Sequence, residues 1–203
     1  MANGNLPAGY IAQPVPGQAI QRLSKEPYYD VAWLAAGIAI AQVTFFQVQL
    51  GGVFPVAAFG VKTLQDTNLM AAGQIPVPYH LFVQGFGLNV QYGATQVDMN
   101  ALYNAATLTF FQGQTPMVQT PLCAIPTVGG FVGATTVNNT AFLCNGMPSP
   151  TNMFKVGSKE KRSIELNAGE TFRCVIDWRA AITPVVALRL QLFMFGMQGI
   201  PVR

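Results

Sequence analysis

The final stretch of the chain, LRLQLFMFGMQGIPVR, alternates between two faces with a period of two. This is the pattern of a β-strand, because successive side chains of a strand point to opposite sides of the sheet. One face carries Leu188, Leu190, Leu192 and Met194, and the other carries Arg189, Gln191, Phe193 and Phe195. The pattern predicts that the first face is buried, and it raises the question of what covers the two phenylalanines on the second.

Most of the remaining chain consists of short apolar runs separated by Gly, Pro and Asn, and such runs are typical of strands. The predicted strands are residues 38–50, 53–61, 80–92, 107–112, 131–137, 163–166, 171–178 and 186–195. Only short helical turns are predicted, within residues 63–73 and 97–108. About eight strands without the spacing of βαβ units predict an all-β fold, an antiparallel β-sandwich whose strand number favours a jelly roll.

Two of the predicted strands have a defined face, and a third segment predicts a turn. The face of the first carries Phe82, Phe86, Leu88, Val90 and Tyr92, and the inward face of the second carries Phe172, Cys174, Ile176 and Trp178. Gly85 and Gly87 interrupt the first strand, which predicts a bulge or a close approach of a neighbouring backbone. The segment IELNAGETF predicts a strand, a tight turn at residues 167–169 and a second strand.

The N-terminal part of the chain has a different composition. Residues 1–30 are rich in Gly, Pro, Asn and Gln and show neither a helical nor a strand period. We therefore expect an extended N-terminal arm at residues 1–30 and a single β-sandwich domain at residues 31–203. The arm either lies along a neighbouring subunit or packs on its own domain.

The low charge of the chain is its most unusual property. Only 9% of the residues are charged, against about 25% in an ordinary soluble domain. Between residues 31 and 154 the charged side chains are Lys62, Asp66 and Asp98 alone. Because a free monomer normally keeps a charged surface, this composition predicts a surface that is covered by other chains or by lipid.

The uncharged stretch at residues 31–61 is long enough to cross a membrane, which takes about 20 apolar residues. Three glutamines, Gln42, Gln47 and Gln49, interrupt it, and its β-branched and aromatic residues favour strands. It also lacks a basic flank. These features argue against a membrane span, although a membrane-associated protein stays an alternative.

The sequence offers little for catalysis. It has a single histidine, His80, and the three cysteines Cys123, Cys144 and Cys174 have the spacing of neither a disulfide framework nor a zinc site. They are expected to be small, reduced hydrophobes. No paired carboxylates and no phosphate-binding loop stand out. We therefore expect no enzymatic activity, cofactor, metal or small-molecule substrate.

A basic loop stands apart from this neutral background, with Lys155, Lys159, Lys161 and Arg162. It predicts a solvated hairpin or, alternatively, a contact with phosphates or with an acidic neighbour. The net charge of +3 is too small to indicate nucleic-acid binding by itself.

Taken together, the Pro- and Gly-rich arm, the segment IELNAGETF and the final alternating strand VVALRLQLFMFGMQG resemble the small jelly-roll structural proteins of tailed bacteriophage virions. The resemblance covers most of residues 31–203 and lies in the style of the sequence, since none of these motifs is diagnostic. It implies a capsid decoration (cement) protein that is located in the virion after synthesis in the host cytoplasm. The implied partners are other copies of the chain, as a homotrimer, and a major capsid protein.

This interpretation gives an expected assembly interface. In it, Phe193 and Phe195 would be covered by another subunit or by its arm, to which Tyr10, Ile11 and Val15 belong. The alternatives that stay open are a jelly-roll major or minor capsid protein, a tail adaptor, and a receptor- or glycan-binding β-sandwich module.

Overall fold

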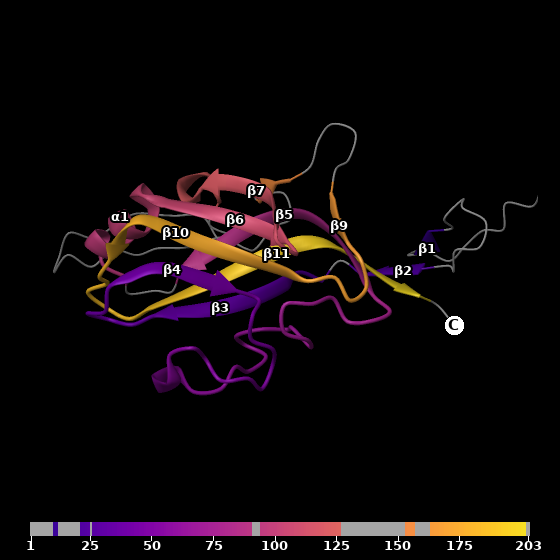
Figure 1. Ribbon diagram of the computed structural model, residues 1–203, viewed down its shortest axis with the longest axis horizontal. Coiled ribbons are helices and arrows are strands. Elements are labelled where there is room, and N and C mark those ends of the chain that lie inside the picture. The colour runs from indigo at the N-terminus through magenta and orange to yellow at the C-terminus, as the bar shows by residue number, and fades with distance from the viewer. Residues whose placement is uncertain are drawn as a thin grey trace, which may run out of the picture.

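The computed structural model describes residues 10–11, 21–24, 26–90, 94–126, 153–156 and 163–201 of the chain. Two antiparallel sheets, one seven-stranded and one four-stranded, pack against each other as a β-sandwich (Figure 1). The predicted all-β, antiparallel sandwich is therefore confirmed. The finer assignment to a jelly roll stays a prediction.

The seven-stranded sheet is built around its longest strand, β11 (Leu188–Pro201). The other members are β1 (Tyr10–Ile11), β2 (Gln21–Ser24), β3 (Tyr28–Leu34), β5 (His80–Val90), β8 (Phe154–Lys155) and β9 (Ile164–Leu166). One edge of β11 pairs with β3 and then with β2, while its other edge pairs with β5. The short strands β8 and β9 pair in turn with β5.

The four-stranded sheet has the order β4-β10-β6-β7. Its strands are β4 (Ile40–Phe45), β6 (Ala106–Gln112), β7 (Thr115–Pro121) and β10 (Phe172–Ile182). The described helices are short: α1 (Gln96–Asn104) and the 3-10 turns η1 (Ala57–Phe59) and η2 (Leu122–Ala124). In α1, the side chain of Thr95 accepts a hydrogen bond from the backbone N–H of Asp98, which caps the first turn.

The core lies between the two sheets. One face of β11 forms part of it, because alternate side chains of this strand point inward. Leu188, Leu190, Leu192 and Met194 all belong to the buried cluster, as predicted. The predicted inward residues of β10 also belong to it: Phe172, Cys174, Ile176 and Trp178. The rings of Phe86 in one sheet and Phe110 in the other lie 5.3 Å apart, so aromatic packing joins the layers directly.

A β-bulge at Gly85 confirms the expectation of an irregularity there and corrects the predicted face of β5. The pairing of β5 with β11 shifts register between Phe195 and Gly196. As a result Leu81 and Val83 face the core before the bulge, and Phe86 does so after it. Phe82, which was expected on the buried face, is only partly buried, because the extra residue reverses the alternation.

One predicted strand is wrong. Residues 53–61 form no strand; they contain the turn η1 and an isolated bridge between Val53 and Val61. The short helical turn predicted within residues 63–73 is present, since the N–H of Thr67 donates to the carbonyl of Thr63. The predicted strand, turn and strand around residues 167–169 are present as β9, a turn and β10, although β9 pairs in one sheet and β10 in the other. Strand β7 was not predicted, and residues 131–137 lie outside the described ranges.

The boundary between arm and domain falls within a continuous strand. Residues 28–30, which were assigned to the arm, are the first part of β3. Within the arm, β2 pairs with residues Gln198–Pro201 of the same chain, and β1 pairs with β2. These two strands extend beyond the end of the sandwich that lies away from β4 (Figure 1).

Candidate functional site

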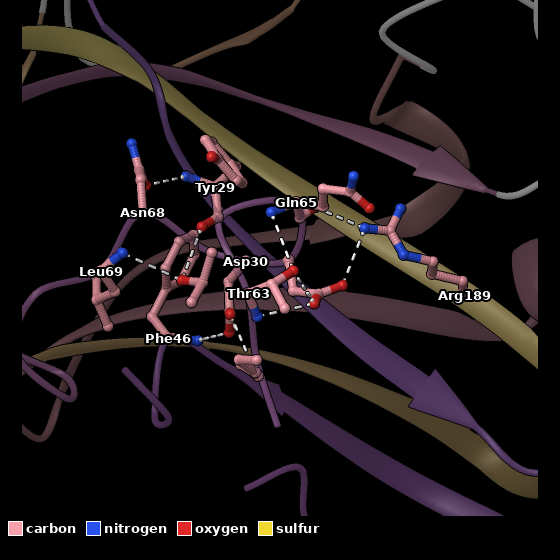
Figure 2. A network of polar contacts seen from close by, with 11 residues as sticks. Tyr29, Asp30, Phe46, Thr63, Gln65, Asn68, Leu69 and Arg189 are labelled. Carbon is pink, nitrogen blue, oxygen red and sulfur yellow. Dashed lines mark hydrogen bonds and ion pairs between the residues drawn. The ribbon is translucent and has the colours of Figure 1, made fainter. Parts of the chain in front are cut away.

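The long connection between β4 and β5, residues 46–79, packs along the edge of β3. Asn68 replaces a neighbouring strand there: its side chain accepts a hydrogen bond from the backbone N–H of Tyr29 at 3.0 Å and donates one to the carbonyl of Pro27 at 2.9 Å. The hydroxyl of Thr67 donates to the carbonyl of Tyr29 at 3.1 Å (Figure 2). These contacts cover the first half of the β3 edge, which protects it from pairing with another chain.

A buried carboxylate, Asp30, fixes the start and the middle of this connection. It accepts hydrogen bonds from the ammonium of Lys62 and from the backbone N–H of Phe46, both at 2.5 Å. Lys62 is only 4% exposed, so both charges are removed from water. Burial raises the pKa of Asp30, while Lys62 and the N–H of Phe46 act in the opposite direction.

The contact with Asp30 also holds an uncommon backbone conformation. Phe46 has a φ of 66°, in the left-handed region that costs a residue with a side chain about 1–2 kcal/mol. Its N–H is bound by Asp30, and its carbonyl accepts a hydrogen bond from the N–H of Gly73 at 2.7 Å. Its ring is fully buried and lies 5.5 Å from the ring of Phe172. The two backbone contacts and the buried ring offset the strain.

On the outer face of the seven-stranded sheet, the same connection borders an open groove of about 720 Å³. The groove is lined by Tyr29, Trp33, Phe54, Phe59, Val61, Thr63, Leu64, Gln65, Asp66, Arg189 and Gln191. The rings of Trp33 and Phe59 stack at 4.6 Å with an angle of 7° between their planes. Leu64 is 65% exposed, so the rim of the groove is apolar as well as aromatic.

The polar wall of the groove is a network around Arg189. Its guanidinium donates to the carbonyl of Gln65 at 2.7 Å and to the carboxylate of Asp66 at 3.1 Å (Figure 2). Asp66 also accepts hydrogen bonds from the N–H and the hydroxyl of Thr63, at 3.0 and 2.9 Å. Partial burial raises the pKa of Asp66, but the hydrogen bonds from Thr63 and Arg189 outweigh it and hold the pKa below its ordinary value.

The predicted interface residues lie beside this groove rather than inside it. Phe193 is half-buried, and its ring lies 6.0 Å from Tyr29 and 6.0 Å from Phe195. Phe195 differs from the expectation, because it is only 6% exposed and needs no second subunit to cover it. Opposite these residues β5 carries Gly87 and Gly85, and a Cβ on Gly85 would lie 2.6 Å from the sulfur of Met153 and 2.6 Å from the carbonyl oxygen of Phe154.

The remaining predicted residues are only partly described. Tyr10 and Ile11 form β1, and Lys155 is an exposed residue of β8 that pairs with Gly85. Val15, Lys159, Lys161 and Arg162 lie outside the described residues. Cys174 is a buried hydrophobe, as expected, and burial raises the pKa of its thiol well above the ordinary value. Cys123 is exposed instead, and Cys144 is outside the described ranges.

The groove itself was missed by sequence reasoning, although one signal could have indicated it. The three charged residues of the long neutral stretch all make contacts within the chain: Lys62 with Asp30, Asp66 with Arg189, and Asp98 with the N–H groups of residues 185 and 186. Isolated charged residues in a neutral sequence therefore indicated the positions where ion pairs and hydrogen bonds hold the loops in place.

The described part of the chain contains no cluster of three or more His, Cys, Asp or Glu residues that could hold a metal ion. Nor does any helix within the described ranges have the length and apolar character needed to cross a membrane. Comparison of the chain with protein-family models, with curated proteins and with solved structures found no match.

The buried pair gives a first prediction. Replacing Asp30 by Asn should lower the free energy of unfolding by about 3–5 kcal/mol, because the ammonium of Lys62 is left buried without its counter-charge. Chemical denaturation followed by circular dichroism measures this. The matched control is Asp177→Asn, in a partly exposed carboxylate that binds Gln42, where a change of about 0.5 kcal/mol is expected. Equal effects of the two substitutions would contradict the role of the pair.

The lowered pKa of Asp66 gives a second prediction. Its contacts stabilise the fold above the unfolded-state pKa of about 3.9, and this contribution is lost as the pH falls through the lower pKa of the folded state. The amide proton of Thr63, which binds the Asp66 carboxylate, should therefore shift in NMR spectra with a midpoint below about 3.9. In Asp66→Asn this titration should disappear; a midpoint above that value in the wild type would show that the hydrogen bonds do not stabilise the charge.

Proposed function

We propose that this protein is a non-enzymatic structural protein of a virus particle, a capsid decoration protein that acts through contacts with copies of itself and with a major capsid protein. The observation that carries the proposal is the group of exposed apolar side chains at the rim of the groove, beside the ion pair of Asp66 and Arg189. Val61 is 52% exposed and Leu64 is 65% exposed, next to the rings of Trp33 and Phe59. Exposed apolar surface that gathers at one place marks an interaction site on a soluble protein.

The placement of the charges supports the same proposal. Lys62 and Asp98 are buried, and Asp66 is engaged by Arg189, so the long neutral stretch contributes almost no free charge to the surface. Neutral polar groups can be buried in an interface without the free-energy cost of desolvating ions. A protein that spends its life between other subunits benefits from such a surface, whereas a free monomer does not. A homotrimer, as the virion resemblance implies, is the assembly that we propose.

A second candidate function is a receptor- or glycan-binding module, and the groove favours it. Trp33 supplies an aromatic wall, and the carboxamides of Gln65 and Gln191 make no hydrogen bond within the described part of the chain. Apolar faces combined with free amide donors and acceptors suit a sugar, which presents both C–H and O–H groups. Part of the Trp33 ring, however, is already covered by Phe59.

The proposed assembly predicts that the purified protein is an oligomer, which light scattering on a sizing column tests. Phe193→Asp should reduce the mass toward 21.8 kDa, because a charge would replace a half-buried ring at the proposed interface. The substitution is confined to Phe193, since Phe195 is buried and its replacement would unfold the chain. Thr107→Asp, a half-buried position on the outer face of the other sheet, is the control and should keep the oligomer. A monomeric wild type would contradict the proposal.

The glycan-binding candidate makes a different prediction. Binding of the wild-type chain on a glycan array should be lost in Trp33→Ala and retained in Phe111→Ala, an aromatic residue on the outer face of the other sheet. An array without bound glycans, combined with an oligomeric wild type, would leave the decoration protein as the supported function.

A further inference from the structure

A second cleft lies on the side of the sandwich where β3 and β4 lie at the edges of their two sheets. This cleft has a volume of about 480 Å³. Its walls come from residues 31–34 of β3, residues 39–44 at β4, and the loop residues Gln47, Val48, Phe54, Pro55, Val56 and Lys62. It is more apolar than the groove, and among its lining residues Lys62 alone carries a charge.

Both strands that border the cleft have a free edge. β4 is the outer strand of its sheet. β3 pairs with β11 on one side, and its other side is covered at its first half, where Asp30 forms an isolated bridge with Thr67, which leaves residues 31–34 unpaired on that side within the described residues. Outside the strand pairings, no backbone hydrogen bond in the described part of the chain involves residues 31–34 or 40–44. Unpaired N–H and C=O groups of an edge strand are able to pair with an additional strand.

The opposite edge of the same sheet is protected, and the edge at the cleft is not. Strand β7, at the far edge, contains Pro116 and Pro121, which lack the N–H group needed to pair with a new strand. Strand β4 has the sequence IAQVTF, without proline and without charge. Natural edge strands that must stay free usually carry such protection. Strand β4 lacks this protection, so its edge is able to accept an additional strand.

Lys62 defines the chemistry of the occupant. Its ammonium has three N–H donors and, within the described residues, one hydrogen-bond partner, Asp30, besides the ring of Phe54 at 5.1 Å. It can therefore donate to one more oxygen in the cleft. Because Asp30 already balances its charge, the site favours a neutral carbonyl over a carboxylate.

We propose that the cleft between β3 and β4 binds an extended, uncharged peptide segment of a second copy of this chain, which adds as a strand to the edge of β4. This inference rests on the proposed function and names a second surface, besides that of Phe193, through which the copies associate. The backbone of the segment pairs with β4, its apolar side chains fill the cleft, and one of its carbonyls accepts a hydrogen bond from Lys62.

The chain has suitable segments outside the described residues. Residues 1–9, 12–20 and 127–152 contain no Asp, Glu, Lys or Arg, so any of them can enter a cleft that lacks net charge. The arm of the same chain leaves from the far end of the sheet: β2 pairs with β11 from Gln198 onward, whereas the cleft lies beside residues 188–191. At about 3.3 Å per residue, the seven residues from Gln191 to Gln198 separate these points by about 23 Å. The arm of the same chain is long enough to span this distance, so the choice of a second copy follows from the proposed self-association, and the isotope-labelled crosslinking below distinguishes the two sources.

Photo-crosslinking tests the occupant. The exposed Ala41 of β4 is replaced by the photoreactive residue p-benzoylphenylalanine, and chains labelled with ¹⁴N and ¹⁵N are mixed, reassembled and irradiated. Mass spectrometry should find mixed-isotope crosslinks from position 41 to residues 1–9, 12–20 or 127–152. The same replacement at Ala124, an exposed alanine of η2 outside the cleft, should not give them. Crosslinks within single-isotope chains alone would overturn the proposal.

A charge at the edge provides the second measurement. Ala41→Lys should weaken association at least about tenfold in light scattering, because a charged side chain blocks strand addition to an edge, while Ala124→Lys should leave it unchanged. Both variants should keep the wild-type circular dichroism spectrum, since both positions are exposed and the fold of the chain is not altered. If the wild type and Ala41→Lys associate equally, the cleft proposal fails and the assembly function stands. If the wild type is monomeric, both fail.

Discussion

The buried carboxylate of Asp30 is the contact on which the arrangement of this molecule depends. It lies at the point where β3, the end of β4 and the long connection to β5 meet, and it binds the N–H of Phe46 and the ammonium of Lys62. Removing two charges from water costs several kcal/mol per ion, so such a pair persists only where its geometry is nearly ideal. Here it stabilises the left-handed backbone conformation of Phe46 and the buried position of Lys62. The connection is thereby fixed at its start and near its middle.

That fixed connection separates two surfaces of different character. On one side it borders the open groove on the outer face of the seven-stranded sheet, and on the other it closes the cleft between β3 and β4. Trp33 and Phe54 line both hollows, so an occupant of one contacts side chains that also shape the other. Interactions at the two surfaces are therefore expected to be physically coupled through these rings.

The neutral composition and the fold explain each other. The few charged residues of the central stretch make contacts within the chain. Lys62 binds Asp30 and holds the connection, Asp66 binds Arg189 in the groove wall, and Asp98 accepts a hydrogen bond from the loop at residues 185 and 186. What reaches the surface consists mainly of amides, hydroxyls and apolar groups. Such a surface desolvates at low cost, which suits permanent contact with other subunits.

The sequence by itself determined the fold class, the central strand and most of the core, because a period of two directly assigns side chains to the two faces of a strand. This holds for β11, where Leu188 to Met194 alternate as predicted, and for the inward face of β10. Only the tertiary structure decided the face of Phe82, since a bulge at Gly85 reverses the alternation. It alone also decided the burial of Phe195, the loop conformation of residues 53–61, and the partners of Asp30 and Asp66. These features depend on contacts between residues far apart in the chain, whereas local periodicity reports only on neighbours.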